Sequence, residues 1–462
     1  MRLINPGDPG YQARRKAFLN TAHPEQLPTL IACCEIESDI PAALALAQSH
    51  GLPYAIRGGG HSFADHSSTT GVLIDLSPLK SIDLDLKAET VRIAPGVQIG
   101  ELARHLAPHN RLVPCGWCPT VGVMGAVLGG GYGVFSRLYG LGADHLLSAS
   151  VLLPNGTHLD ADPDLLWALR GAGAARFGVV TSMTLRTRPA LPATAVQAVV
   201  DFSHAAALID TWQHWAPSAP DEVNLELAIA APDDPDDPPY AVLFGVVADS
   251  EARTRTLLTD LLDPARASLT RLSPAEAACH HSYADGGGGA ATTLPPGERP
   301  GLRLNKSGFF PGPLPRSAIE DLLTRLVTDR VYGEIRDLEL VPWSGAIARV
   351  APTATAFTHR TPSFLLKQSV QLGFRAPTPR REEAHAWLRR AWAPLQPWST
   401  GVYPNYPDVD LPDALPAYYG DNLPRLRKLM EMYGKAVPGT PPVHDPQAQS
   451  RSYNAAGAPS AP

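Results

Sequence analysis

Three consecutive glycines followed at once by a histidine, in the segment "IRGGGHSF" at residues 56–63, constrain this chain more than any other feature. The glycines come directly after "PYAIR", a short apolar run that is typical of a buried strand. Glycine lets the backbone approach another group closely, because no Cβ stands in the way. On its own, such a run indicates a simple turn as readily as a nest of backbone N–H groups that binds an anion.

Two further glycine clusters help to decide between these readings, "GAVLGGGYG" at 125–133 and "RGAGAARFG" at 170–178. The last cluster fails as a Rossmann fingerprint, because Arg176 stands where the third glycine belongs and a strand-like run follows instead of a helix. The chain contains no GxxxxGK[ST] motif, which excludes a P-loop NTPase. The remaining two runs favour a backbone nest for the diphosphate of a nucleotide-like ligand.

Residues 1–190 predict an α+β unit. A helix should begin near Ser38 or Asp39 and stop at Gly51, and the runs "GVLIDLS", "TVRIAPG" and "RFGVVTSMTLRTRP" should be strands. The segment "QIGELARHLAPHN" predicts a helix with one apolar face. Asn155 and the glycine after it give a hairpin signal.

After residue 190 the pattern changes. Strand-like runs such as "YAVLFGVV" and "SFLLKQSVQLGF" alternate with amphipathic helices such as "RSAIEDLLTRLVTD". This alternation predicts a second domain, an antiparallel sheet covered by helices on one face. We expect the first domain at 1–190, the second at 191–404, a C-terminal segment at 405–450 that returns to the first domain, and a disordered tail at 451–462.

Composition limits the classes of partner. The formal net charge is -6, from 45 acidic and 39 basic residues, and no long basic block is present, which argues against nucleic acid. No run of 18 apolar residues and no secretory signal occurs, so neither a membrane nor export is expected. The 5 cysteines are irregularly spaced, which argues against a disulfide framework. We expect a cytoplasmic enzyme that is a monomer or a homodimer, with no metal site.

The combination of "RGGGHS", "GWCPTVG" and "GGGYGVFSRLYGLGAD" resembles the berberine-bridge-enzyme family of FAD-linked oxidases. That family belongs to the vanillyl-alcohol-oxidase superfamily, with its PCMH-type FAD-binding fold. The resemblance extends over nearly the whole chain except parts of 190–330 and the tail. It implies an α+β protein of two domains, the PCMH-type FAD-binding fold and a substrate domain with an antiparallel sheet covered by helices.

The resemblance implies that FAD is attached twice, through His61 to the 8α-methyl carbon and through Cys118 to C6 of the isoalloxazine ring. An imidazole nitrogen and a thiolate are both competent nucleophiles toward an electron-poor ring. Cys115 is a nearby thiol but lies outside the matching motif. Val121 matches the family position that controls access of oxygen to the flavin, and a valine at this position resembles members of the family that use O2. The further cofactor contacts that the resemblance implies are Arg57, Gly58, Gly59, Gly60, Ser62, Pro119, Thr120, Gly122, Gly125, Gly129, Gly130, Gly131, Tyr132, Gly133, Val180, Asn405 and Asn422.

The resemblance also suggests where a catalytic base should lie. Gln368 stands where some alkaloid-oxidising members have a glutamate, and Leu366 stands at a lysine position of alcohol-oxidising members. An amide cannot act as a base, so Tyr406 becomes the better candidate, with Tyr403 as the alternative. A tyrosine base working near pH 7 needs its pKa lowered by ~3 units, or roughly 4 kcal/mol. Tyr139 matches another substrate-side position.

These implications predict a flavoprotein oxidase that removes a hydride from a C–OH or C–N centre, or drives an oxidative cyclisation, on a small natural product. O2 would reoxidise the flavin and release H2O2. Ala126 stands where the family often has a histidine, and Met124, Arg176 and Leu366 also depart from the usual residues. Together these departures argue against sugar- or monolignol-type activity and leave open a specialised reaction in bacterial secondary metabolism, such as antibiotic biosynthesis. The alternatives are a flavin dehydrogenase with another acceptor and a flavin-bearing binding protein without turnover.

Overall fold

The computed structural model describes residues 1–462 except 19–25, 174–175, 281–301, 374–375 and 434–462. Its described part contains sheets of 4, 5 and 7 strands and a 2-stranded pair, with helices packed against them. The predicted α+β class is confirmed. The last twelve residues, expected to be a disordered tail, lie outside the described residues.

The first sheet contains the strand that precedes the glycine run. Its order is β1 (Arg2–Ile4), β2 (Leu30–Cys33), β4 (Val72–Asp75) and β3 (Tyr54–Arg57), and the last three strands are parallel. Helix α2 (Asp39–Ser49) covers it with residues spaced three and four apart, as the sequence predicts, namely Ile40, Ala43, Leu44 and Ala47. Strand β3 therefore delivers "GGGH" to one end of this sheet.

The second sheet is antiparallel, in the order β5 (Ile82–Asp85), β6 (Thr90–Ile93), β10 (Val179–Arg186), β8 (Leu146–Leu152) and β9 (His158–Asp160). The predicted hairpin between β8 and β9 is confirmed, since Gly156 has a φ of 85° in the turn. The strand expected to run up to Pro189 ends earlier. Residues Arg188–Pro189 instead form a separate strand, β11, that pairs with β7 (Arg111–Leu112).

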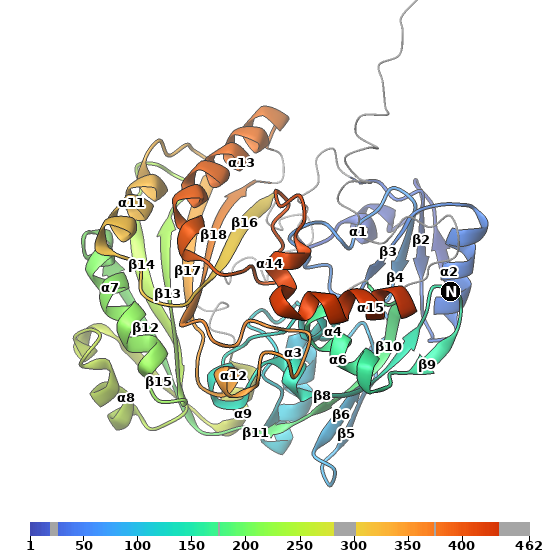
Figure 1. Ribbon diagram of the computed structural model, residues 1–462, viewed down its shortest axis with the longest axis horizontal. Helices are drawn as coiled ribbons and strands as arrows, with labels where there is room; N and C mark the ends of the chain where they lie inside the picture. The colour runs from blue at the N-terminus through green and yellow to red at the C-terminus, as the bar shows by residue number, and fades with distance from the viewer. Residues whose placement is uncertain (19–25, 174–175, 281–301, 374–375, 434–462) are drawn as a thin grey trace, which may run out of the picture.

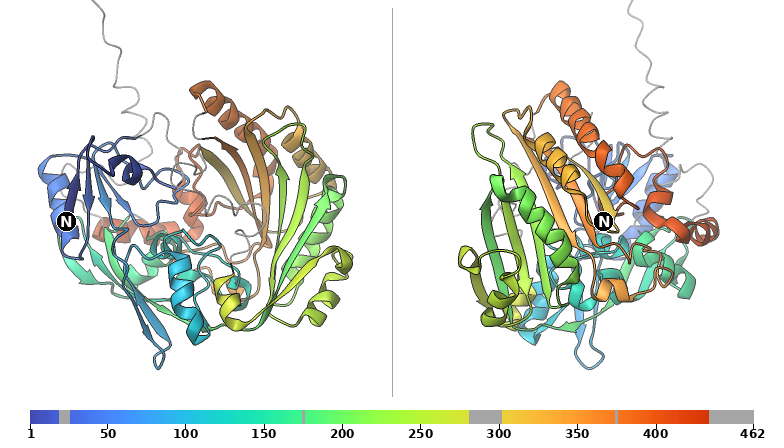
Figure 2. Two further views of the ribbon diagram at one scale, coloured as in Figure 1. Left: turned by 180° about the vertical axis from the view of Figure 1, so that it is seen from behind. Right: turned by 60° about the vertical axis from the view of Figure 1, so that its left-hand side comes forward.

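The third sheet has seven antiparallel strands, as predicted for the second half of the chain. In spatial order they are β15 (Ser268–Leu272), β12 (Ala193–Asp201), β14 (Tyr240–Val247), β13 (Val223–Ala231), β17 (Glu334–Pro342), β18 (Phe364–Leu372) and β16 (Arg303–Phe310). Figures 1 and 2 show this sheet standing beside the two smaller sheets, with its strands curving around the middle of the molecule.

One face of the seven-stranded sheet is covered by α7 (Ala205–Trp215), α11 (Arg316–Val327) and α13 (Thr378–Trp392), which lie on the outside of the molecule (Figure 1). Alternate strand residues such as Leu340 and Leu366 pack under these helices. The residues in between point to the opposite face and toward the smaller sheets. Phe309, Val341 and Leu365 of these strands pack with Phe357 and Tyr403, which lie outside the sheet, in a separate aromatic-rich core.

The described end of the chain packs beside the second sheet. Helices α14 (Leu415–Tyr419) and α15 (Leu423–Tyr433) share a core with α3 (Ile99–Leu106), α4 (Val123–Leu128) and α6 (Pro163–Ala172), seen as red beside cyan and green in Figure 1. The other α-helices in the described residues are α1 (Tyr11–Arg15), α5 (Ser136–Tyr139), α8 (Glu251–Leu258), α9 (Pro274–Cys279) and α12 (Ala346–Arg349). None of the helices in the described part of the chain has the length and apolar composition needed to cross a bilayer.

Candidate active site

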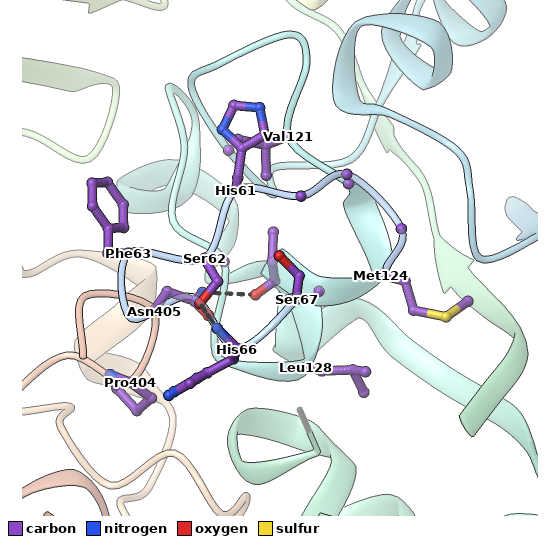
Figure 3. Close-up of a pocket in the computed structure, with 18 of the residues that line it drawn as sticks. His61, Ser62, Phe63, His66, Ser67, Val121, Met124, Leu128, Pro404 and Asn405 are labelled. Atoms are coloured by element: carbon purple, nitrogen blue, oxygen red, sulfur yellow. Dashed lines mark hydrogen bonds between the residues drawn. The ribbon is translucent and has the colours of Figure 1, made fainter. Parts of the chain in front are cut away.

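A cavity of about 400 Å³ lies between the smaller sheets and the inner face of the seven-stranded sheet. This volume is within the range of small-molecule and cofactor sites. Figure 3 shows His61, Ser62 and Phe63 following the glycine run along its wall, with Pro404 and Asn405 contributed from near the other end of the chain. The inner sheet face contributes Arg303, Glu339 and Lys367.

Two glycines bring the histidine and cysteine motifs together. A Cβ added to Gly59 would lie 2.2 Å from the backbone nitrogen of Gly122, and one added to Gly122 would lie 2.8 Å from the nitrogen of Gly59. Both distances are too short for any side chain, so the two loops can pack only through glycine. Gly125 differs, because its added Cβ meets nothing within 4 Å although the residue borders the cavity. Backbone approach between two loops therefore explains part of the glycine pattern.

His61 and Cys118 meet at one hydroxyl group. The Oγ1 atom of Thr120 lies 3.0 Å from Nε2 of His61 and 3.4 Å from Sγ of Cys118. The His61 ring stacks on Phe18 at a centroid distance of 3.9 Å, which fixes its plane. Cys115 also borders the cavity, but burial raises the pKa of its thiol to about 12, which disfavours the nucleophilic thiolate. The structure thus places the predicted pair, and not Cys115, in one polar setting.

The opposite wall carries a cluster of charged and phenolic side chains. Glu339 and Lys367 are directly opposite one another on β17 and β18, and Nζ of Lys367 donates a hydrogen bond to Glu339. The hydroxyl of Tyr132 donates to Oε1 of Glu339 at 3.0 Å and lies 2.7 Å from the hydroxyl of Tyr406. Lys367 also lies 4.9 Å from the centre of the Tyr406 ring. We call Tyr132, Glu339, Lys367 and Tyr406 the phenol–carboxylate cluster.

The environment of this cluster keeps its phenols neutral. Burial and the nearby charge of Glu339 raise the pKa of Tyr406 and of Tyr132 well above 10.0. The direction is opposite to the lowering that a tyrosine base needs. Glu226, on the neighbouring strand β13, is fully buried, and neither of its carboxyl oxygens has a hydrogen-bond partner within the described structure. Burial and the nearby Glu339 raise the pKa of Glu226 well above 4.5, which favours its neutral form.

Tyr403, the alternative base, is committed to structural contacts. Its hydroxyl accepts hydrogen bonds from the backbone N–H of Gly131 and from Nδ2 of Asn405, both at 3.0 Å. Burial raises its pKa to about 12. The Asn405 amide also donates to the carbonyl of Ala126 at 2.9 Å. Tyr403 and Asn405 therefore hold the second glycine run against the C-terminal segment.

The placement of Gln368 requires a correction. Along β18, Lys367 borders the cavity, so Gln368 next to it points to the helix-covered face together with Leu366. The functional group on the inner face is Lys367, one residue away from both positions considered in the sequence. Tyr139 also lies outside the cavity lining, and its hydroxyl donates to the carbonyl of Pro189 at 2.9 Å.

The predicted cofactor contacts divide into two groups. Arg57 donates from its guanidinium to the carbonyls of Arg14, Arg15 and Ser67, and Asn422 donates to carbonyls between residues 352 and 356, so both are structural. The residues that border the cavity are Gly58, Gly59, Gly60, His61, Ser62, Cys118, Val121, Gly122, Gly125, Gly131, Tyr132, Val180 and Asn405. Those outside its lining are Arg57, Pro119, Thr120, Gly129, Gly130, Gly133 and Asn422.

Sequence reasoning missed Glu226, Glu339 and Lys367. The signal that could have found them is the presence of charged residues inside apolar strand runs, where burial of a charge requires a partner. The residues present fit a flavin, because two nucleophiles of suitable type border a cavity whose wall leaves open space at Gly125. The apolar and aromatic remainder of the wall, including Phe63, Trp117 and Met124, suits an aromatic ring system.

Comparison with known proteins agrees with this site. Residues 28–162 match the family described as FAD binding domain, and residues 402–433 match the family described as berberine and berberine like. An uncharacterized FAD-linked oxidoreductase, YgaK of Bacillus subtilis, is 27% identical over 94% of both chains. Tetrahydroberberine oxidase of Berberis wilsoniae is 34% identical over 46% of this chain and 42% of its own. The structure of Physcomitrella patens BBE-like 1 superposes with a TM-score of 0.81 at 25% identity, covering 94% of both chains.

Fold, site and relatives define the protein as an FAD-linked oxidoreductase. More narrowly, residues 28–162 and 402–433 match the FAD-binding and berberine-like domains of the berberine-bridge-enzyme-like flavoproteins, and the family resemblance read from the sequence is confirmed.

Proposed function

We propose that this protein is an oxidase with bicovalently attached FAD that acts on a C–OH or C–N centre of a small natural product. The observation that carries the proposal is the convergence of His61 and Cys118 on the Thr120 hydroxyl at one wall of the cavity. His61 would hold the 8α-methyl carbon and Cys118 would hold C6. When bound, the flavin supplies a two-electron acceptor for a hydride, which O2 reoxidises with release of H2O2.

This chain's own residues would then orient the substrate and exclude water. Phe63 and Trp117 offer apolar contact area, and Tyr406 borders the cavity with the Lys367 ammonium group over its ring. A relative named tetrahydroberberine oxidase favours a C–N centre as one substrate type. Val121, which borders the cavity, matches the family position at which a valine resembles members that use O2, and this resemblance favours O2 as the acceptor. We also propose that the protein is cytoplasmic. Its domain boundaries are proposed to lie near residues 190 and 404.

Covalent attachment has a direct test. After acid precipitation and denaturing gel electrophoresis, the washed wild-type band should retain flavin fluorescence after the cysteinyl link is oxidised with performic acid. His61→Ala and Cys118→Ala should each keep flavin through the other residue, and the double variant should keep none. Cys115→Ala is the matched control and should retain both links, because its thiol is buried. A colourless washed wild-type pellet contradicts the proposal.

A second measurement separates oxidase from dehydrogenase. After anaerobic photoreduction, admission of air should restore the oxidised flavin spectrum within seconds and produce one equivalent of H2O2. Slow recovery in air combined with fast recovery on adding an artificial acceptor favours the dehydrogenase. A flavin that cannot be reduced at all favours a binding protein without turnover.

A further inference from the structure

The ring plane of His61 is set by a contact from a distant part of the chain. Phe18 stacks on the His61 imidazole with ring centroids 3.9 Å apart and an angle of 13° between the two planes. Rotation about the last side-chain bond of a histidine is broadly distributed, so the rotamer alone does not fix this plane. The hydrogen bond between Thr120 and Nε2 of His61 fixes one ring atom. This hydrogen bond and the stacked phenyl ring together define both the position and the plane of the imidazole.

The segment that carries Phe18 is held against the glycine run by backbone contacts. The N–H of Phe18 donates a hydrogen bond to the carbonyl of Gly60 at 2.9 Å. Gly60 has a φ of 72°, a backbone conformation that glycine adopts readily. Nη1 of Arg57 donates to the carbonyl of Arg14 at 2.6 Å, in the same N-terminal segment. The motif that contains His61 therefore also docks the segment whose phenyl ring covers the imidazole.

The orientation of the imidazole matters for the bond that it would form. Attachment replaces one C–H bond of the 8α-methyl group by a C–N bond to His61. The methyl hydrogen and the imidazole N–H hydrogen leave as two protons, and the two electrons left on the flavin pass to O2, which becomes H2O2. The reacting nitrogen must face the methyl carbon at roughly 3–3.5 Å before the bond forms. An imidazole that turns about its side-chain bond meets this condition only part of the time.

We propose that Phe18 is a positioning residue for the covalent attachment of the flavin to His61. The inference rests on the proposed function, which supplies the histidyl bond. The phenyl ring holds the imidazole in the plane in which a ring nitrogen faces the methyl carbon, and so raises the rate at which that bond forms. A thiol has no ring plane, so Phe18 has no such effect on the bond to Cys118. The two covalent bonds therefore differ in their dependence on the N-terminal segment.

The test measures each covalent bond by itself. Cys118→Ala protein can hold flavin only through His61, and His61→Ala protein can hold it only through Cys118. Each protein is prepared from riboflavin-starved cells and mixed with FAD in air, and the appearance of acid-stable flavin is followed. Adding Phe18→Leu, which removes the aromatic face, should slow attachment about 3- to 10-fold in the Cys118→Ala protein. It should leave the rate of attachment unchanged in the His61→Ala protein.

Phe18→Tyr is the matched control, because it keeps a planar ring and should restore the rate in the Cys118→Ala protein. A merely structural role of Phe18 would slow attachment alike in both backgrounds, and that result overturns the inference. Equal rates with phenylalanine and leucine at position 18 also overturn it. A Cys118→Ala protein that never gains acid-stable flavin overturns the histidyl bond of the proposed function, and this inference with it.

Peptide mapping of the Phe18→Leu single variant decides the proposal without a change at either nucleophile. Samples are digested at successive times after FAD is added, and mass spectrometry separates flavin joined to Cys118 alone from flavin joined to both residues. The form joined to Cys118 alone should persist longer in Phe18→Leu than in the wild type, because only the histidyl bond is slowed. The same time course in both proteins overturns the inference, even if the Cys118→Ala protein fails to fold.

Discussion

At the scale of single residues, substitution by alanine should have different effects at two glycines of the same site. Gly59→Ala should destabilise the fold by about 1–3 kcal/mol or more, because the new Cβ would lie 2.2 Å from backbone that cannot move away. Gly125→Ala is the matched control. It meets nothing within 4 Å, so thermal unfolding of the flavin-free protein should be unchanged or slightly improved.

The flavin content of the two variants should separate these effects. Gly125 borders the cavity, so its added methyl group should lower the flavin bound per chain while the protein stays folded. Gly59→Ala should lower both stability and flavin content. The measurements are the unfolding temperature and the ratio of flavin to protein absorbance. Equal stability of the two variants would contradict the close packing of Gly59 on Gly122.

The residue scale also shows what a sequence can and cannot reveal about a site. His61 and Cys118 are predictable because each stands in a short local motif whose spacing sets its chemistry. Lys367 and Glu339 depend on which face of a strand meets the cavity, and a one-residue error moves a side chain to the opposite face. The sequence-based placement of Gln368 and Leu366 made that error. The Tyr132–Glu339 contact joins residues 207 positions apart, which no local pattern encodes.

At the scale of elements, an ion-pair group fixes the segment that carries Tyr403 and Tyr406. Nζ of Lys306, on edge strand β16, lies 2.6 Å from Oδ1 of Asp408 and also donates to Asp410. Lys306 and Asp408 are 6% and 5% exposed. Lys306→Met should cost about 3–5 kcal/mol of unfolding free energy, because it leaves a buried carboxylate without its cation. Urea denaturation measures this loss.

The control for Lys306 is a surface ion pair. Lys80 bonds to Glu101 at 2.7 Å, but their side chains are 37% and 33% exposed, so Lys80→Met should cost about 1 kcal/mol or less. If the Lys306 variant is as stable as the Lys80 variant, the buried pair does not hold the segment. If the Lys306 variant folds, the NMR signals of Tyr406 should differ from those of the wild type, because the loop that carries Tyr406 is no longer anchored to the sheet.

The existence and type of most elements are predictable, whereas their order in space is not. Helix α11 and strands β14 and β18 are predictable from the local periodicity and length of their apolar runs. The seven-stranded order places β13 beside β17, strands about a hundred residues apart, and β16 at an edge next to β18. Such pairings depend on long-range packing of side chains, which a single sequence does not display.

At the scale of the whole molecule, stability should depend on pH through a few buried groups. Burial lowers the pKa of His145 and of His359 from 6.5 to about 4. Their contribution is fully present above pH 6.5 and is lost as the pH falls toward 4. The contribution of Glu226 to stability has the opposite pH dependence, because its folded-state pKa is raised. Its contribution is fully present below pH 4.5 and is lost as the pH rises.

The two effects overlap between pH 4.5 and pH 6.5. There the unfolded chain binds two more histidine protons, while the folded chain binds one more at Glu226, so the difference is one proton. Stability should rise with pH across this interval by about 1.4 kcal/mol per pH unit. Above pH 6.5 the two histidines no longer oppose Glu226, whose raised pKa makes stability fall as the pH rises.

The unfolding temperature should therefore pass through a maximum near pH 6.5, and Glu226→Gln should change its shape in a specific way. Without the Glu226 proton, the rise between pH 4.5 and pH 6.5 should steepen to about 2.7 kcal/mol per pH unit, and the decline above pH 6.5 should become smaller. Calorimetry of both proteins from pH 4.5 to pH 8 measures the two slopes. A parallel decline of wild type and variant above pH 6.5 would show that Glu226 does not hold its proton in the folded state.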